Sequence, residues 1–241
     1  MFNLNEMLKQ KGFVLYENAS IVVIATIKST NKKTGEMVQI WILVKSVDPV
    51  TASRKKLDFL NCGDCKHRHN KNGACYVNLG QAPLMIYKSY KKGLYYNGVD
   101  SVEQFIKVVK SKDLKIRWGA YGDPSFIPQN IVNKINQETK TEKNSFNTGY
   151  SHQWHKVKVS KSFMASVDSL HEKARANARG YRTFRVTLKN DLTKDEIFCP
   201  SDTNKNITCK TCGLCDGSRN AKNIAILVHG SRKKNFSSVA R

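Results

Sequence analysis

After residue 100, short apolar runs of strand length alternate with segments that carry helix-start signals. This alternation restricts the fold more than any other feature of the sequence. The expected strands are residues 114–120, 147–151, 163–167, 181–188 and 223–228, and the expected helices are residues 102–111, 128–138 and 170–179. Short connections between them favour right-handed crossovers. We therefore expect an α/β fold with a mostly parallel sheet, which is either open or an incomplete (β/α) barrel.

Helix boundaries are indicated by local signals. Ser101 with Gln104, and Ser169 with Glu172, have the spacing of capping boxes. Gly93 and Gly180 follow the expected ends of helices over residues 80–92 and 170–179. Each signal predicts where a helix begins or ends.

The first 60 residues are expected to be β-rich. Residues 21–27 and 39–44 are apolar and flank the turn sequence of residues 31–35, which predicts an N-terminal β-hairpin. We expect residues 1–230 to form one α/β metal-binding domain and residues 231–241 to form a basic C-terminal tail.

Charge and hydropathy limit the partners. The chain has 41 Lys and Arg against 19 Asp and Glu, a net charge of +22, which favours nucleic acid as a partner. The alternative is a lysine-rich surface set by the base composition of the coding sequence. Since no apolar run approaches the roughly 18 residues of a membrane span, no membrane partner is expected. The first residues lack a secretory signal pattern, which predicts a reducing, cytoplasmic location in a host cell.

The seven cysteines fall into two groups. The first group is Cys62, Cys65 and Cys75, and the second is Cys199, Cys209, Cys212 and Cys215. Spacings of two residues let neighbouring thiolates face one metal centre from a tight turn. In a reducing compartment this pattern predicts two metal-binding loops rather than disulfides.

The identity of the metal is left open by the spacing. Three cysteines at successive two-residue spacings plus a distant fourth favour a [4Fe–4S] cluster in the second group, with tetrahedral zinc as the alternative. The first group is either Cys3His zinc, completed by His67 or His69, or a three-cysteine cluster with one open iron. A third possibility pools both groups around one site.

The ends of the expected strands carry polar residues. Parallel α/β sheets place functional residues in the loops beyond these ends. Gly122, Asp123, His152, Asp168 and His229 occupy such loops. We expect Asp123, His152, Asp168 and His229 to be catalytic, although Asp123 and Asp168 also suit plain turn or cap positions.

Several stretches resemble a family of poorly characterised phage and prophage proteins rich in cysteine. They are Cys62-Gly-Asp-Cys65-x-x-Arg68, Ala74-Cys-Tyr-Val-Asn-x-Gly-Gln-Ala-Pro83, Gly119-Ala-Tyr-Gly-Asp-Pro124, Thr148-Gly-Tyr-Ser-His-Gln-Trp154, Met164-Ala-Ser-Val-Asp-Ser169, and Cys199-Pro-Ser-Asp202 through His229-Gly230. This resemblance covers roughly residues 40–230 and brings no secure activity with it.

A more distant similarity is to radical S-adenosylmethionine enzymes. It rests on a three-cysteine loop before a helix, a strand ending in Gly122-Asp123-Pro124, and a strand ending in Ser166-Val-Asp-Ser169. The resemblance implies that Cys62, Cys65 and Cys75 hold a [4Fe–4S] cluster and that Gly122 and Asp123 bind S-adenosylmethionine. The chain departs from the family in its cysteine spacing, which is C-x2-C-x9-C instead of C-x3-C-x2-C.

Three functional hypotheses follow. The first is an iron–sulfur enzyme of radical S-adenosylmethionine type acting on nucleic acid or a nucleotide-bearing substrate. The second is a metal-stabilised nucleic-acid-binding protein of phage replication or regulation, without catalysis. The third is a hydrolase with a catalytic metal at His152, His155 and Asp123.

Overall fold

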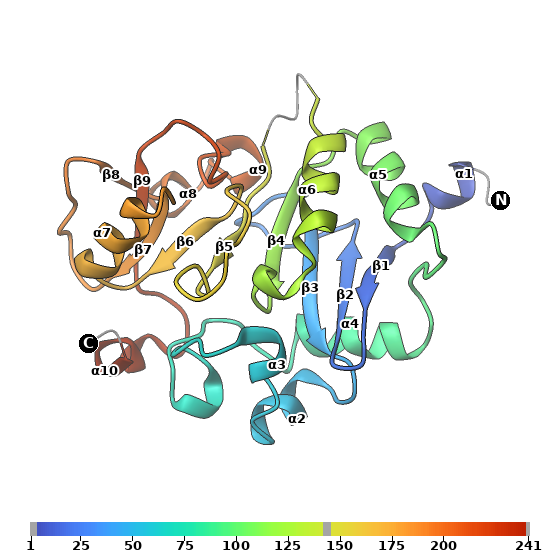
Figure 1. Cartoon of the computed structure of the whole chain (residues 1–241), viewed down its shortest axis with the longest axis horizontal. Coiled ribbons are helices and arrows are strands. Elements are labelled where there is room, and N and C mark those ends of the chain that lie inside the picture. Colours follow the sequence, from blue (N-terminus) through green and yellow to red (C-terminus); the bar gives the residue numbers. More distant parts are fainter. Residues whose placement is uncertain (1–3, 142–145, 240–241) are drawn as a thin grey trace.

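The fold contains two β-sheets that lie next to each other (Figure 1). The computed structural model describes residues 4–141 and 146–239. The first sheet has the order β1-β2-β3-β4, formed by β1 (Gly12–Glu17), β2 (Ile21–Thr26), β3 (Val38–Val44) and β4 (Ile116–Tyr121). Strands β1, β2 and β3 are antiparallel, whereas β3 and β4 are parallel. The predicted N-terminal hairpin is confirmed as β2 and β3.

The second sheet is wholly parallel. Its order is β5-β6-β7-β9-β8, formed by β5 (Tyr150–Ser151), β6 (Met164–Val167), β7 (Thr183–Thr187), β9 (Asn223–Leu227) and β8 (Glu196–Phe198). All four strand pairs run in the same direction. The predicted mixture of helices with a mostly parallel sheet is thus confirmed, while the described strands do not close into a barrel.

A single parallel bridge links the two sheets. It joins Arg117 of β4 to Thr148, just before β5. The Trp118 amide donates to the Thr148 carbonyl at 2.7 Å, and the Thr148 amide donates to the Ile116 carbonyl at 2.8 Å. From β3 to β8 every neighbouring segment is therefore parallel, so the carboxyl ends of these strands meet at one edge.

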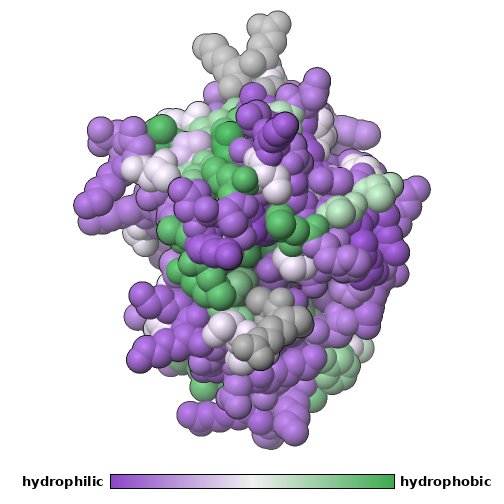
Figure 2. Space-filling view, turned by 90° about the vertical axis from the view of Figure 1, so that its left-hand side faces the viewer, coloured by the Kyte–Doolittle hydropathy of each residue, from purple (hydrophilic) through white to green (hydrophobic). Residues whose placement is uncertain are grey.

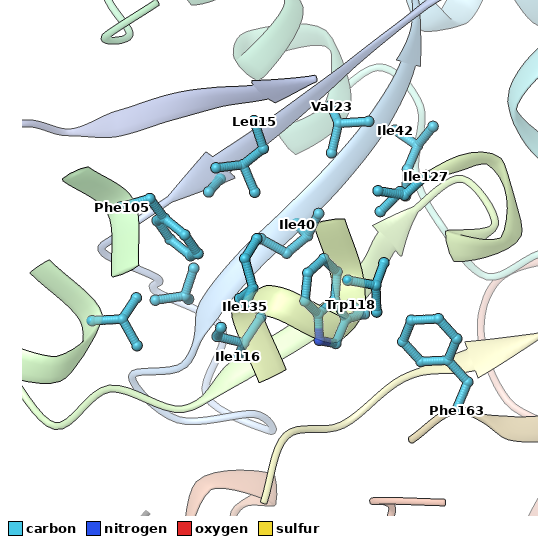
Figure 3. Packing of buried hydrophobic residues seen from close by; sticks show 14 of the residues in the cluster. Leu15, Val23, Ile40, Ile42, Phe105, Ile116, Trp118, Ile127, Ile135 and Phe163 are labelled. Atoms are coloured by element: carbon cyan, nitrogen blue, oxygen red, sulfur yellow. The ribbon is translucent and has the colours of Figure 1, made fainter. Parts of the chain in front are cut away.

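One face of the sheets is covered by α5 (Ser101–Ser111), α6 (Gln129–Glu138) and α7 (Leu170–Ala178). Phe105, Ile116, Trp118, Ile135 and Phe163 pack there in one apolar cluster (Figure 3). Burying each such side chain contributes roughly 1.5–3 kcal/mol. The indole N–H of Trp118 donates to Asn136 at 3.1 Å, so the buried polar atom of the largest core residue is satisfied.

The opposite face, which we call the inner face, is covered differently along its length. Over β1–β4 it packs against α4 (Ala82–Lys91), which contributes Tyr87 to a cluster with Val14, Ile24 and Leu43. Over β6 and β9 it packs against Cys199 and Cys215 through Met164, Ile224 and Ile226. The cysteine segments therefore stand where a helix would otherwise cover the second sheet.

Several predicted boundaries need correction. Residues 49–60 were expected within a β-rich region, but they contain α2 (Pro49–Arg54) and the beginning of α3 (Phe59–Cys62). The predicted capping box at Ser101 is wrong, because Ser101 lies inside α5 and donates to the Tyr96 carbonyl, while the Gln104 amide donates to Asp100. Ser169 does cap α7, as predicted, by accepting from the Glu172 amide at 3.1 Å.

The remaining elements are short. They are α1 (Leu4–Met7), η1 (His69–Lys71), η2 (Pro124–Phe126), α8 (Pro200–Thr203), α9 (Cys209–Cys212), η3 (Lys233–Asn235) and α10 (Phe236–Val239). In the described residues, no helix combines the length and the apolar character needed to cross a membrane. Figure 2 shows a largely hydrophilic face with apolar side chains gathered near its middle.

Candidate metal centre

The first cysteine group lies on a loop that folds back on itself at the end of α3. Cys62 is the last residue of α3, and the Cys75 amide donates to the His67 carbonyl at 3.0 Å. The chain passes so close at Gly73 that a Cβ there would lie 2.1 Å from the carbonyl carbon of His67. Glycine is therefore required at this crossing, and it brings Cys75 back beside Cys62 and Cys65.

A buried ion pair holds this loop against α3. Arg68 donates to Asp58 at 3.0 Å, and the side chains are only 10% and 4% exposed. Asn70 donates to the same carboxylate oxygen. Burial raises the pKa of Asp58 despite the nearby Arg68. The loop is thus fixed to the N-terminal end of α3 by polar contacts.

The C-terminal segment closes the loop from outside. Arg232 donates to the Gly73 carbonyl at 2.8 Å and to the His69 carbonyl at 3.3 Å. Phe236 is 3% exposed and stacks on His67, with ring centroids 5.6 Å apart. Residues 232–236 therefore belong to the packed structure instead of extending as the predicted tail; residues 240 and 241 lie outside the described residues.

The second cysteine group follows β8 and includes α9. Ser201 lies between Cys199 and Cys209, with its Oγ 3.3 Å and 3.9 Å from their sulfur atoms. Thr208 caps α9, and Gly213 ends it in the left-handed conformation, with φ +65°. Cys215 is buried. The three positions of the C-x2-C-x2-C run are thus held by a capped turn rather than by a long helix.

Helix α9 is docked on the N-terminal hairpin. The Cys209 amide donates to the Lys33 carbonyl at 3.1 Å, and the Lys210 amide donates to the Thr34 carbonyl at 3.0 Å. Lys210 also pairs with Glu36 at 3.0 Å. The turn of residues 31–35 thus has a second role, as the support for the last cysteine segment.

Both cysteine groups line one cavity of about 410 Å³ on the inner face of the sheets. Cys62, Cys65 and Cys75 contribute from one side, and Cys199 and Cys209 from the other. Five different strands line the cavity on the side of the sheets, and the residues they contribute include Tyr121, Tyr150, Ser166, Phe184 and Ile226. Burial and the neighbouring thiolates raise the pKa of Cys62 and raise that of Cys75 to about 11. The third possibility, a site that pools both groups and leaves some cysteines unligated, stays a prediction.

The donor atoms favour some metal centres over others. Among residues 4–141 and 146–239, no three His, Cys, Asp or Glu side chains are arranged to hold a metal ion as they stand. The predicted Cys3His alternative stays a prediction, because His69 Nε2 lies 3.0 Å from the Val77 carbonyl and His67 Nε2 lies 2.7 Å from Asp168, which leaves the Nδ1 atom of either ring as the nitrogen that could bind a metal. All-thiolate sets of three and four fit iron–sulfur clusters, which place several irons between their ligands.

Gly122 and Asp123 line the cavity as predicted. Gly122 has φ +84°, and a Cβ there would lie 2.5 Å from the Ile42 carbonyl oxygen. Asp123 accepts from the amides of Ser125 and His152 and from the Ser151 hydroxyl, all within 3.0 Å. Its carboxylate therefore ties η2 to the end of β5, the cap role that was the alternative to catalysis.

Of the two predicted residues, His152 lines the cavity, whereas Asp168 does not line it and instead contacts the lining residue His67 at 2.7 Å. His152 lies 3.1 Å from Ser166, and its ring is 5.7 Å from that of His67. Burial lowers the pKa of His152, but Cys65, Asp168 and Asp123 outweigh it and raise the pKa to about 10. Nδ1 of His67 and Oδ1 of Asp168 are buried and have no protein partner in the described residues. His155 lies 3.8 Å from Asp64, and among the described residues His152, His155 and Asp123 do not form a group that could hold a metal ion.

His229 is exposed at the rim of the cavity, with its ring 5.3 Å from that of Tyr76. Tyr76 and Arg117 were not anticipated as site residues. Arg117 donates to the Tyr76 hydroxyl at 2.8 Å and to Gln39 at 3.1 Å. The only sequence signal for Tyr76 is its position next to Cys75, and Arg117 gives no signal at all.

Fold and site together define a mixed α/β protein with a cysteine-lined cavity. Comparison of the chain with protein families, curated proteins and solved structures finds no match.

Proposed function

We propose that this chain is an iron–sulfur protein of phage type, in which Cys62, Cys65 and Cys75 hold one [4Fe–4S] cluster and Cys199, Cys209, Cys212 and Cys215 hold a second. The observation that carries the proposal is the shared cavity, to which both cysteine groups contribute thiols. A structural metal alone has no need of such a cavity, whereas a reactive centre needs space for its substrate. The volume of about 410 Å³ suits a small-molecule site.

The enzyme class we propose is that of radical S-adenosylmethionine enzymes. The parallel run from β3 to β8 supports an incomplete barrel, with α5, α6 and α7 outside and the cavity inside. The three-cysteine loop follows β3, and Gly122 with Asp123 follows β4. When bound, a cluster with three cysteine ligands would supply electrons and one open coordination position.

The residues of the chain have distinct roles in this proposal. Gly122 lines the cavity, and its lack of a side chain lets the turn after β4 pack against the Ile42 backbone. Asp123 positions the His152 amide, and Asp168 orients the His67 ring. Phe236 stacks on His67 and excludes water from that side. His152 and His67 are the groups placed to hold or move a proton at the cavity wall.

Metal analysis of protein purified without oxygen tests the cluster assignment. We expect about eight irons and eight sulfides per chain, from two [4Fe–4S] clusters, with the broad visible absorption of such clusters. Cys65→Ser and Cys212→Ser should each remove about half of the iron, because the two groups bind separately. Zinc without iron in the wild-type protein would refute the assignment.

Exposed lysines next to each group provide matched controls. Lys71→Ala and Lys205→Ala change the same loops without touching a thiol, and they should keep the full iron content. If Lys205→Ala lost as much iron as Cys212→Ser, the loss would reflect loop folding and not ligation.

Reductive cleavage of S-adenosylmethionine tests the enzyme class. Reduced wild-type protein should release 5′-deoxyadenosine, and Cys65→Ser should not, whereas Cys212→Ser should retain some cleavage. Absence of cleavage by protein with both clusters intact would exclude this class.

The second candidate is a metal-stabilised nucleic-acid-binding protein without catalysis. The observation in its favour is that four thiolates from one segment are also what structural zinc requires. It predicts a structural zinc or iron–sulfur centre and no cleavage of S-adenosylmethionine. Zinc without iron favours this candidate, and the cleavage assay separates the two candidates if iron is present.

A further inference from the structure

A second and larger hollow, of about 1070 Å³, lies over the inner face of the first sheet. We call it the basic groove. Its cationic residues are Lys9, Lys11, Lys28, Lys112 and Arg117, and its described lining contains no Asp or Glu. The lysines are exposed. Such a concentration of unopposed cations attracts an anionic ligand.

The basic groove also offers flat apolar surface between its cations. Tyr76 is 50% exposed, Leu94 is 51% exposed, and Tyr95 is partly exposed beside it. Trp41 lies in the wall, with its N–H already donated to Thr26 at 3.0 Å. Phosphate-binding cations together with aromatic faces are the combination that binds single-stranded nucleic acid. The volume exceeds what one small molecule needs.

The basic groove joins the cysteine-lined cavity. The two hollows share Asn31, Tyr76, Val77, Arg117 and Ala120 as lining residues. Tyr76 directly follows Cys75, and Arg117 holds its hydroxyl at 2.8 Å. A nucleotide stacked on Tyr76 would thus lie at the entrance to the cavity.

We propose that the basic groove binds single-stranded nucleic acid and presents one nucleotide to the cysteine-lined cavity past Tyr76 and Arg117. The presentation step rests on the proposed function, whereas binding in the groove does not require it. The ligand class follows from the pairing of cations with stacking surfaces, since a polyanion without bases would leave the aromatic side chains unused.

Salt-dependent binding of a fluorescent 12-nucleotide oligo(dT) or oligo(U) to the full-length protein is the first test. Lys11 and Lys28 flank the paired ends of β1 and β2, so Lys11→Ala/Lys28→Ala removes two neighbouring cations. The negative slope of log affinity against log salt should become shallower by about 1.4, since each of the two lost single-strand phosphate contacts contributes about 0.7. Affinity at 0.1 M salt should fall by about 25-fold on the same counterion-release arithmetic.

Two comparisons identify the site. Lys189→Ala/Lys194→Ala removes the same charge from exposed positions outside the groove and should barely change the slope. Tyr76→Leu should weaken binding by about tenfold through lost stacking, and Tyr76→Phe should retain it. A 4-thiouridine oligonucleotide should photocrosslink to Tyr76 or His229.

The outcomes distinguish this inference from the proposed function. Equal slope changes in the two lysine variants, or equally tight binding of heparin or polyglutamate, would overturn the single-strand site. Absence of oligonucleotide binding in a protein with two clusters would overturn it and leave the iron–sulfur assignment standing. Groove-specific binding by a protein without iron would support the groove and refute the clusters.

Discussion

The buried pair of Arg185 and Glu196 gives the clearest test of how the second cysteine group is supported. Arg185 of β7 donates to both carboxylate oxygens of Glu196, at 2.8 and 2.9 Å, and the side chains are 3% and 0% exposed. Glu196 begins β8, three residues before Cys199. Removing one partner of a buried pair typically costs about 3–5 kcal/mol, because the other charge is left uncompensated.

Arg185→Met should therefore lower the free energy of unfolding by about 3–5 kcal/mol. For a chain of this size, that corresponds to a fall in Tm of about 6–20 °C. Urea unfolding followed by tryptophan fluorescence measures the change. Arg185→Met/Glu196→Leu should recover part of the loss, since it removes both charges.

The exposed pair of Lys134 and Glu103 provides the control, because its side chains are 43% and 46% exposed. Lys134→Met should leave Tm nearly unchanged. A loss below about 1 kcal/mol for Arg185→Met, or a loss equal to that of the control, would refute the reasoning on buried pairs.

This pair also predicts a pH dependence. Burial opposes ionisation of Glu196, but Arg185 and Thr193 outweigh it and hold its pKa below the usual 4.5. The stabilisation is therefore complete above about pH 4.5 and is lost as the pH falls through the pKa of the folded state. Wild-type protein should lose stability more steeply than Arg185→Met/Glu196→Leu between about pH 5 and pH 3.

Three further predictions concern the two cysteine groups and their surroundings. Gly122→Ala should lower the free energy of unfolding in urea more than Gly93→Ala does. Both glycines have positive φ, but only at Gly122 would the new Cβ meet backbone, 2.5 Å from the Ile42 carbonyl oxygen. We expect about 1–3 kcal/mol of backbone strain, and equal losses in the two variants would contradict this contact. Arg232→Ala should speed amide hydrogen exchange over residues 65–75 without affecting residues 209–215, since its bonds go to Gly73 and His69. Thr208→Ala removes the cap of α9 and should lower the stability of that helix by about 0.5–2 kcal/mol. It should therefore reduce the iron bound by the second group, while the iron bound by the first group stays unchanged and provides the internal control.

Much of the fold could be predicted because its signals are local. The apolar runs of β3, β6 and β9 and the Ser169 cap of α7 depend on neighbours within a few residues. The short helix α9 and its Thr208 cap were not predicted. Strand β8 was not predicted, because its three residues are too few to show the alternation of apolar and polar side chains that indicates a strand. At Ser101 the same local reasoning failed, because Asp100 competes for Gln104.

The candidate site was predictable only where residue type is itself informative. Cysteine spacing indicates a metal centre wherever the loops lie, and the strand ends located Asp123 and His152. The contacts of Arg117 with Gln39 and Tyr76 span 78 and 41 residues. Hydrophobic periodicity is a local pattern, so it cannot predict contacts between residues that lie so far apart in the sequence. The pairing of His67 with Asp168 spans 101 residues in the same way.

The docking of α9 on the N-terminal hairpin has a consequence for the order of events during synthesis. Lys210 and Glu36 are separated by 174 residues. At about 5–20 residues per second, a ribosome needs about 9–35 s to produce the chain between them. The hairpin can therefore form while the support for the second group still lacks its partner. Arg232 and Phe236, which close the first cysteine loop, are made later still. We therefore expect neither cysteine loop to reach its final packing until nearly the whole chain has been made.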